Sequence, residues 1–156
     1  MNKRSTATLV MVGYFAVLIK IMVFKDMPTI RVGGMMIKFS GTQAGPPNLI
    51  PFTTIWRYLL GENGLMIGGI NIIGNVVLLV PIGFLIPFVF HGITWKRAVA
   101  FAMIAGFMIE GMQGLLRVGI FDIDDVILNA LGVIIGYWAC ISLRNWWLSR
   151  NMKRQK

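Results

Sequence analysis

The stretch EGMQGLLRVGIFDIDDVILNALGVIIG, residues 110 to 136, decides how this chain is interpreted. It places polar and charged side chains inside and between two apolar segments. It holds four of the six acidic residues of the chain: Glu110, Asp122, Asp124 and Asp125. The flanking segments are apolar enough to lie in lipid, where a carboxylate is costly and is usually functional. This concentration of acidic groups therefore indicates a candidate site.

Composition indicates a membrane protein. Of the 156 residues, 56% are hydrophobic and only 13% are charged, and the mean hydropathy is +0.73. A soluble globular domain carries about 25% charged residues. We therefore expect an all-α integral membrane protein, namely a small bundle of about four transmembrane helices with a short amphipathic helix that is interfacial or re-entrant.

Four apolar stretches are long enough to cross a membrane as helices. They cover about residues 7–24, 65–90, 98–116 and 124–143. Residues from about 25 to 64 are rich in Pro, Gly, Lys and Arg, so we expect an extracellular connection there, in which MMIKFSG (35–41) is a candidate short strand. Because no repeat or low-complexity linker divides the chain, residues 1–156 are expected to form a single membrane domain.

The segment PPNLIPFTTIWRYLLGENG, residues 46–64, differs from the rest of this connection. Its apolar residues fall on one helical face beside Arg57: Ile55, Trp56, Leu59 and Leu60. This pattern predicts a short amphipathic helix in the membrane interface. Asn48, Thr53 and Thr54 are candidate caps for that helix.

Proline and glycine predict how two of the spans are built. Pro81 lies inside the second span, where it frees a backbone carbonyl, so we expect a kinked or partly re-entrant helix. Gly132 and Gly136 in the fourth span form a GxxxG pair, which lets two helix backbones approach closely. We therefore expect an irregular helix in the second span and a close contact with a neighbouring helix in the fourth.

Helical spacing gathers the polar residues of the opening stretch onto two faces. Glu110, Gln113 and Arg117 are spaced i, i+3 and i+7, so they share one face of the third span. Asp125 and Asn129 share a face of the fourth span with the two glycines. Each face can meet a neighbouring helix or a ligand.

The distribution of basic residues predicts the orientation. Four spans put both termini on one side of the membrane, and that side holds Lys3, Arg4, Lys96, Arg97 and the basic tail but no acidic residue. Because Lys and Arg accumulate on the cytoplasmic side, we expect both termini to be cytoplasmic. The acidic residues then converge on the outer leaflet, together with Asn71 and Asn75 at the start of the second span.

The polar residues have three competing interpretations. They could form interhelical hydrogen bonds that hold the bundle together. They could bind a ligand, and the candidate ligand-binding residues are Glu110, Gln113, Arg117, Asp122, Asp124, Asp125, Asn129, Asn71 and Asn75. Finally, Glu110 with Asp122 or Asp125 could act as a catalytic acid and base if their environments separate their pKa values.

Several other chemistries are not indicated. The DIDD run offers oxygen ligands suited to Mg²⁺ or Ca²⁺ but lacks the spacing of an EF-hand loop, and His91 is solitary, so we predict no metal and no cofactor. The single cysteine, Cys140, excludes an intramolecular disulfide. Although the formal net charge is +9, no nucleic-acid-binding module is present.

Four motifs together resemble the VanZ-like family of small bacterial membrane proteins, which is named for a teicoplanin-resistance protein. They are NLIPF (48–52), NIIGNVVLLVPIGFLIP (71–87), IEGMQ (109–113) and FDIDDVILNALGVIIGY (121–137). The chain departs from the family where Gly106 stands in place of a frequent Ser. The resemblance implies a multi-pass protein of the bacterial plasma membrane that contributes to low-level resistance to teicoplanin and related lipoglycopeptides.

Taken together, the family resemblance and the positions of the acidic residues suggest two functions. The first is an outward-facing acidic groove that binds a lipid-anchored ligand, with membrane lipid and a lipoglycopeptide antibiotic or a lipid-linked cell-wall precursor as partners. The alternative is a membrane enzyme that acts on a polyprenyl-linked or cell-envelope substrate and uses Glu110 with Asp122 or Asp125.

Overall fold

A computed structural model describes residues 2–24, 30–32, 35–37, 45–62, 64–116 and 119–154. The helices are α1 (Lys3–Phe24), α2 (Thr53–Leu59), α3 (Leu65–Val89), α4 (Trp95–Leu115) and α5 (Ile123–Arg154). Two short strands, β1 (Ile30–Val32) and β2 (Met35–Ile37), form an antiparallel pair, and β2 falls within the expected strand segment.

Four of these helices, α1, α3, α4 and α5, are long and apolar enough to cross a membrane. Together with the short α2, they confirm the predicted all-α membrane architecture. The chain is therefore a multi-pass membrane protein. Helix α5 continues to Arg154, well beyond the expected end of the fourth span near residue 143. Hydropathy did not predict these last turns because many of their residues are polar or charged.

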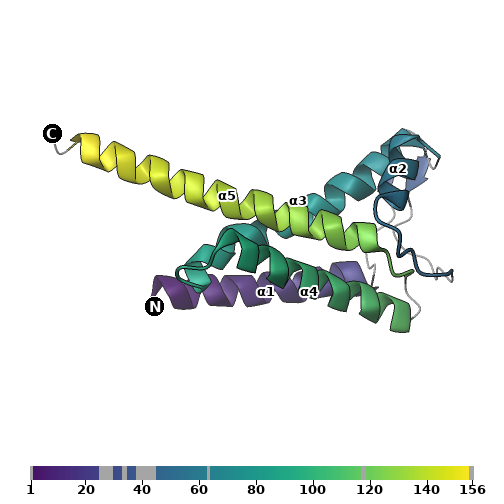
Figure 1. Cartoon of the computed structure of the whole chain (residues 1–156), viewed down its shortest axis with the longest axis horizontal. Coiled ribbons are helices and arrows are strands. Elements are labelled where there is room, and N and C mark those ends of the chain that lie inside the picture. The colour runs from purple at the N-terminus through teal and green to yellow at the C-terminus, as the bar shows by residue number, and fades with distance from the viewer. Residues whose placement is uncertain are drawn as a thin grey trace.

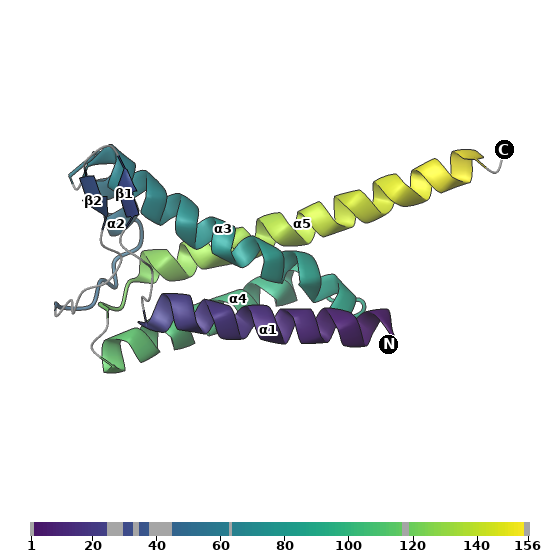
Figure 2. The ribbon, with the colours of Figure 1, turned by 180° about the vertical axis from the view of Figure 1, so that it is seen from behind.

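Both termini lie at the same end of the bundle, and α2 lies at the opposite end (Figures 1 and 2). Helices α3 and α5 make the most extensive contact, α4 packs on α5, and α1 packs on α3 and α4. The turns at residues 142 to 150 of α5 are exposed and extend past the other helices (Figure 1). The even number of spans agrees with this placement of the two termini.

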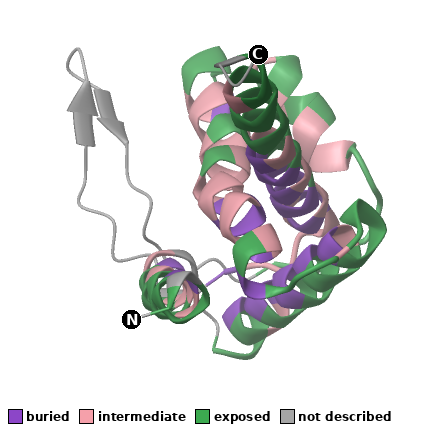
Figure 3. Ribbon diagram, turned by 90° about the vertical axis from the view of Figure 1, so that its left-hand side faces the viewer, coloured by how far each residue is buried: buried purple, intermediate pink, exposed green. Residues whose placement is uncertain are grey.

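The core lies where the helices face one another (Figure 3). Its most deeply buried apolar side chains are Leu18, Ile86, Val126 and Val133. The Tyr14 hydroxyl donates to the Leu78 carbonyl oxygen at 2.9 Å, which ties α1 to α3. Large apolar side chains cover much of the outer surface, as expected for helices that are solvated by lipid tails.

Glycines set the close approach of α3 and α5. A Cβ atom added at Gly132 would collide with the Val76 carbonyl oxygen, and one added at Gly136 would collide with the Val80 carbonyl oxygen. The two backbones thus touch directly, as the GxxxG spacing predicts. Helix α3 is continuous through Pro81 and is long and apolar enough to cross a membrane on its own.

We predict that Gly136→Ala destabilises the bundle by about 1 to 3 kcal/mol, because α3 and α5 must separate to accept the added methyl group. Thermal denaturation of the purified protein in detergent measures this effect. The matched control is Gly111→Ala on α4, where no atom lies within 4 Å of the added Cβ. Equal melting temperatures for the two variants would contradict the proposed close packing.

Candidate functional site

The segment before α2 runs beside the start of α5. The Asn48 N–H donates to the Phe121 carbonyl oxygen at 2.9 Å, and the Ile123 N–H donates to the Asn48 carbonyl oxygen at 3.0 Å. These two bonds form an isolated parallel bridge between Asn48 and Asp122. The bridge brings the NLIPF motif and the FDIDD motif into one place.

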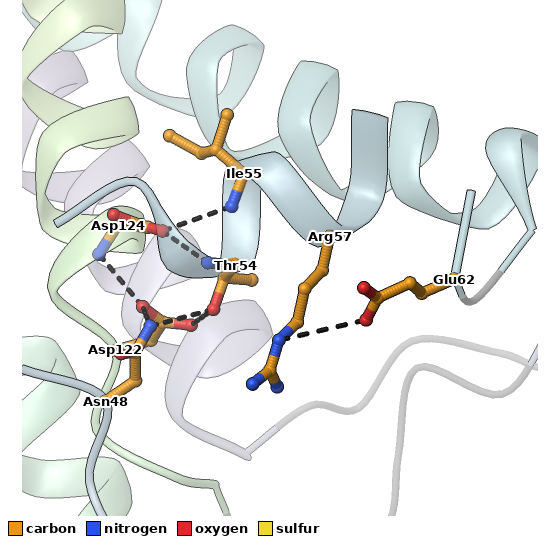
Figure 4. Close-up of polar contacts among 7 residues, drawn as sticks. All are labelled: Asn48, Thr54, Ile55, Arg57, Glu62, Asp122 and Asp124. Carbon is orange, nitrogen blue, oxygen red and sulfur yellow. Dashed lines mark hydrogen bonds and ion pairs between the residues drawn. The ribbon is translucent and has the colours of Figure 1, made fainter. Parts of the chain in front are cut away.

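The carboxylate of Asp122 joins these two segments through side chains (Figure 4). It accepts from Asn48 Nδ2 at 3.0 Å and from the Thr54 hydroxyl at 2.6 Å. Asn48 Nδ2 also donates to the Thr54 hydroxyl oxygen at 2.9 Å, which closes a three-residue network. The Asp124 N–H donates to the same carboxylate at 2.9 Å, so Asp122 also satisfies a free N–H group at the start of α5.

Asp124 binds the start of α2 through the backbone. Its carboxylate is fully buried and accepts from the N–H groups of Phe52 (2.5 Å), Thr54 (2.7 Å) and Ile55 (3.1 Å). The first N–H groups of a helix have no partner within the helix and carry partial positive charge, so a carboxylate placed there is stabilising. Asp124 therefore does for α2 what an N-cap residue does, although it comes from another helix.

This arrangement corrects the predicted caps. Phe52 stands at the N-cap position of α2 with φ 69°, and no side chain of the segment caps the helix there. The side chains of Asn48 and Thr54 bind Asp122 instead. The physical reason is that an ionised carboxylate is a stronger acceptor than a hydroxyl or an amide oxygen, so Asp124 occupies the position that a local cap would take.

Glu110 and Gln113 on α4 are both buried. Glu110 Oε2 accepts from the Asp122 N–H at 3.2 Å, so the end of α4 contacts the start of α5 at the same network. On α3, Asn75 Nδ2 donates to Asp125 Oδ1 at 2.6 Å and ties α3 to α5 beside it. The structure thus brings together four of the predicted acidic residues with Asn75 at one end of the bundle.

Asn71 and Asn129 are not hydrogen-bonded to this network. Asn71 Nδ2 donates to the Ile67 carbonyl oxygen of its own helix at 2.9 Å. Asn129 is only 1% exposed, and its side-chain amide forms no hydrogen bond within the described part of the chain. Arg117 lies outside the described residues, and its role stays a prediction.

Tyr58 on α2 is a member of the site that sequence reasoning missed. It is half-buried, and burial raises the pKa of its phenol, which the charges of Asp125 and Asp122 raise further. The phenol is therefore neutral at physiological pH and can donate a hydrogen bond. The sequence predicted Asn48 and Thr54 only as helix caps. The position of Asn48 in the motif NLIPF was the one signal that could have indicated its contact with the acidic residues.

Helix α2 and the loop before it expose apolar side chains, which we call the apolar platform. Its members are Leu49, Ile50, Phe52, Trp56, Leu59 and Leu60. No residue of α2 is buried, although the helix packs closely on α3, where a Cβ added at Gly68 would meet Tyr58. The exposed ion pair between Arg57 and Glu62, at 3.8 Å, lies on the same segment and contributes little stability.

The chemistry available at the site is that of an anchored surface. The oxygens of Asp122 and Asp124 accept hydrogen bonds from the 48–55 segment and from the start of α5, so these two carboxylates fix the apolar platform to the spanning helices. Among the described residues, no group of three or more His, Cys, Asp or Glu side chains is placed to bind a metal ion.

The fold and the site define a small multi-pass membrane protein whose acidic residues bind a short helix, α2. The chain matches the VanZ/LLP1 family model over residues 11–145, and it belongs to that family. Protein VanZ of Enterococcus faecium is 29% identical over 89 residues, which make up 57% of this chain and 48% of that relative. The matched segment thus spans about half the length of the relative. No solved structure matches the chain.

We predict that Asp124→Asn weakens the attachment of α2 by roughly 2 to 4 kcal/mol, because the N–H groups of Phe52, Thr54 and Ile55 lose an ionised acceptor. Hydrogen exchange at Thr54 and Ile55 should accelerate by roughly a hundredfold, since about 1.4 kcal/mol is a factor of ten. Glu62→Gln, which changes an exposed carboxylate on the same segment, is the control. Unchanged exchange at both amides in Asp124→Asn would contradict this role for Asp124.

Proposed function

We propose that this protein contributes to low-level resistance to teicoplanin and related lipoglycopeptides by binding a lipid-anchored ligand at the outer face of the bacterial plasma membrane. Membership of the VanZ/LLP1 family supports this proposal. In the proposed orientation both termini are cytoplasmic. Support comes from the basic residues Arg4, Lys96, Arg97 and Lys153 at the end of the bundle that carries the termini, opposite the acidic residues.

The observation that carries the proposal is the apolar platform. Its largest exposed side chain is Trp56, which is 62% exposed although α2 is fixed at its N-terminus by Asp124. An acyl chain laid on such a surface gains about 0.8 kcal/mol for each buried CH₂ group. A platform held rigidly before binding also loses little conformational entropy when the ligand arrives.

The polar part of the proposed ligand would meet the residues beside the platform. The half-buried pair of Asp125 and Asn75, next to Tyr58, supplies a carboxylate and hydrogen-bonding groups for amides, amines and sugar hydroxyls. In this proposal Asp122 and Asp124 position the platform. Ligand contacts by Glu110, Gln113, Arg117, Asn71 and Asn129 remain part of the predicted outward-facing groove.

We predict that Trp56→Ala removes protection against teicoplanin and leaves the amount of protein in the membrane unchanged, because the platform loses its largest side chain. The inhibitory concentration in cells that express each variant measures this effect. Trp138→Ala on α5, which removes a 49% exposed tryptophan far from the platform, should keep protection. Equal protection by the wild-type protein against a glycopeptide without an acyl chain would contradict binding through the acyl chain.

We propose as an alternative that the protein is a membrane enzyme for a polyprenyl-linked or cell-envelope substrate, with Glu110 and Asp122 or Asp125 as acid and base. The 3.2 Å hydrogen bond from the Asp122 N–H to Glu110 Oε2 favours it, because the bond holds the two acidic residues side by side.

If this alternative holds with Asp125 as the partner, Glu110→Gln and Asp125→Asn each abolish resistance while folded protein remains in the membrane, because an amide cannot transfer the proton. With Asp122 as the partner, Glu110→Gln and Asp122→Asn do so. Resistance and membrane abundance are measured together. Retained resistance in both variants would exclude catalysis by this pair. A loss of resistance in proportion to a loss of abundance would assign both residues a role in stability.

A further inference from the structure

A cavity of about 850 Å³ lies at the end of the bundle opposite the apolar platform. It is bounded by the start of α1, the end of α3 and the exposed last turns of α5, at the end where both termini lie (Figure 2). Its apolar lining comes mainly from Phe84, Phe88 and Leu143. None of the residues assigned to the proposed function contributes to it.

Basic side chains accompany this apolar lining. Arg4 on α1 and Arg144 on α5 both line the cavity, and His91 lies at the turn between α3 and α4. Neither guanidinium group forms an ion pair with any residue that the structure describes. None of the described acidic residues lines the cavity. The cavity therefore combines an apolar wall with positive charge that no described side chain neutralises.

Two tryptophans of the cavity indicate a position near the surface of a membrane. Trp146 and Trp147 line it, and tryptophan is enriched where the hydrocarbon region meets the lipid headgroups. Arg150 stacks on the Trp146 ring, with its guanidinium carbon 4.4 Å from the ring centroid, so one more cation lies at this level. An acyl chain would thus lie against the phenylalanines while a headgroup lies beside the arginines.

We propose that this cavity binds an anionic phospholipid. One acyl chain packs against Phe84, Phe88 and Leu143, and the phosphate accepts hydrogen bonds from Arg4 and Arg144. Basic pockets between transmembrane helices bind anionic lipid headgroups on the cytoplasmic side, where such lipids give the surface a negative potential. Arginine suits this role because its planar group can donate two parallel hydrogen bonds to one phosphate.

The test uses the full-length protein, purified in a non-ionic detergent, and native mass spectrometry with added phosphatidylglycerol or phosphatidylcholine. We expect bound phosphatidylglycerol at concentrations where phosphatidylcholine does not bind. The double variant Arg4→Gln, Arg144→Gln should weaken phosphatidylglycerol binding about tenfold or more, because both charge-assisted contacts to the phosphate are lost. The double variant Lys96→Gln, Arg97→Gln removes the same charge at the same end, outside the cavity, and should bind as the wild type does.

Equal binding of the two lipids by the wild-type protein would overturn the proposal, and so would equal phosphatidylglycerol binding by the two double variants. A second variant guards against misfolding of the first. Leu143→Glu changes one exposed position and sets a carboxylate beside Arg144, so it should also abolish phosphatidylglycerol binding. Wild-type affinity in Leu143→Glu would likewise contradict the proposed site.

Discussion

The buried carboxylate of Asp124 and its three backbone donors are the contact on which the α2 end of this protein depends. Phe52, Thr54 and Ile55 present N–H groups that a seven-residue helix with no cap of its own leaves without partners. Because several donors surround the charge, its removal from water is compensated far better than that of an isolated carboxylate. The same contact fixes where α2 begins and which side of it stays exposed.

Asp122 and the polar residues of the other spans extend this contact into a network that links three spanning helices. Asp122 binds Asn48 and Thr54, Glu110 of α4 accepts from the Asp122 backbone, and Asn75 of α3 binds Asp125. Lipid supplies no hydrophobic drive for helix association, so such hydrogen bonds and close glycine contacts carry much of it. These two kinds of contact lie in different parts of the bundle. The glycine contacts join α3 and α5 along their length, and the hydrogen bonds of the acidic residues join the helices at one end.

Hydropathy and helical spacing predicted the four spanning helices and the short amphipathic helix, because both signals are local. The acids of residues 110–136 do lie together at one end of the bundle, and that they bind a ligand stays a prediction. The partners of those acids could not be predicted, since Asn48 and Asp122 are 74 positions apart and no local pattern pairs them. The helical turns beyond residue 143 were not predicted, because their charged residues resemble those of any polar chain terminus.

In the proposed function, the acidic residues of the stretch 110–136 hold an apolar platform that binds an acyl-bearing ligand. The most direct measurement places a photoreactive amino acid at position 56 and tests crosslinking to teicoplanin in intact cells, with position 138 as the control. We expect a crosslink at position 56 that disappears when Asp124→Asn is added, and none at position 138. Equal crosslinking at both positions, or a crosslink at position 56 that persists in Asp124→Asn, would contradict it.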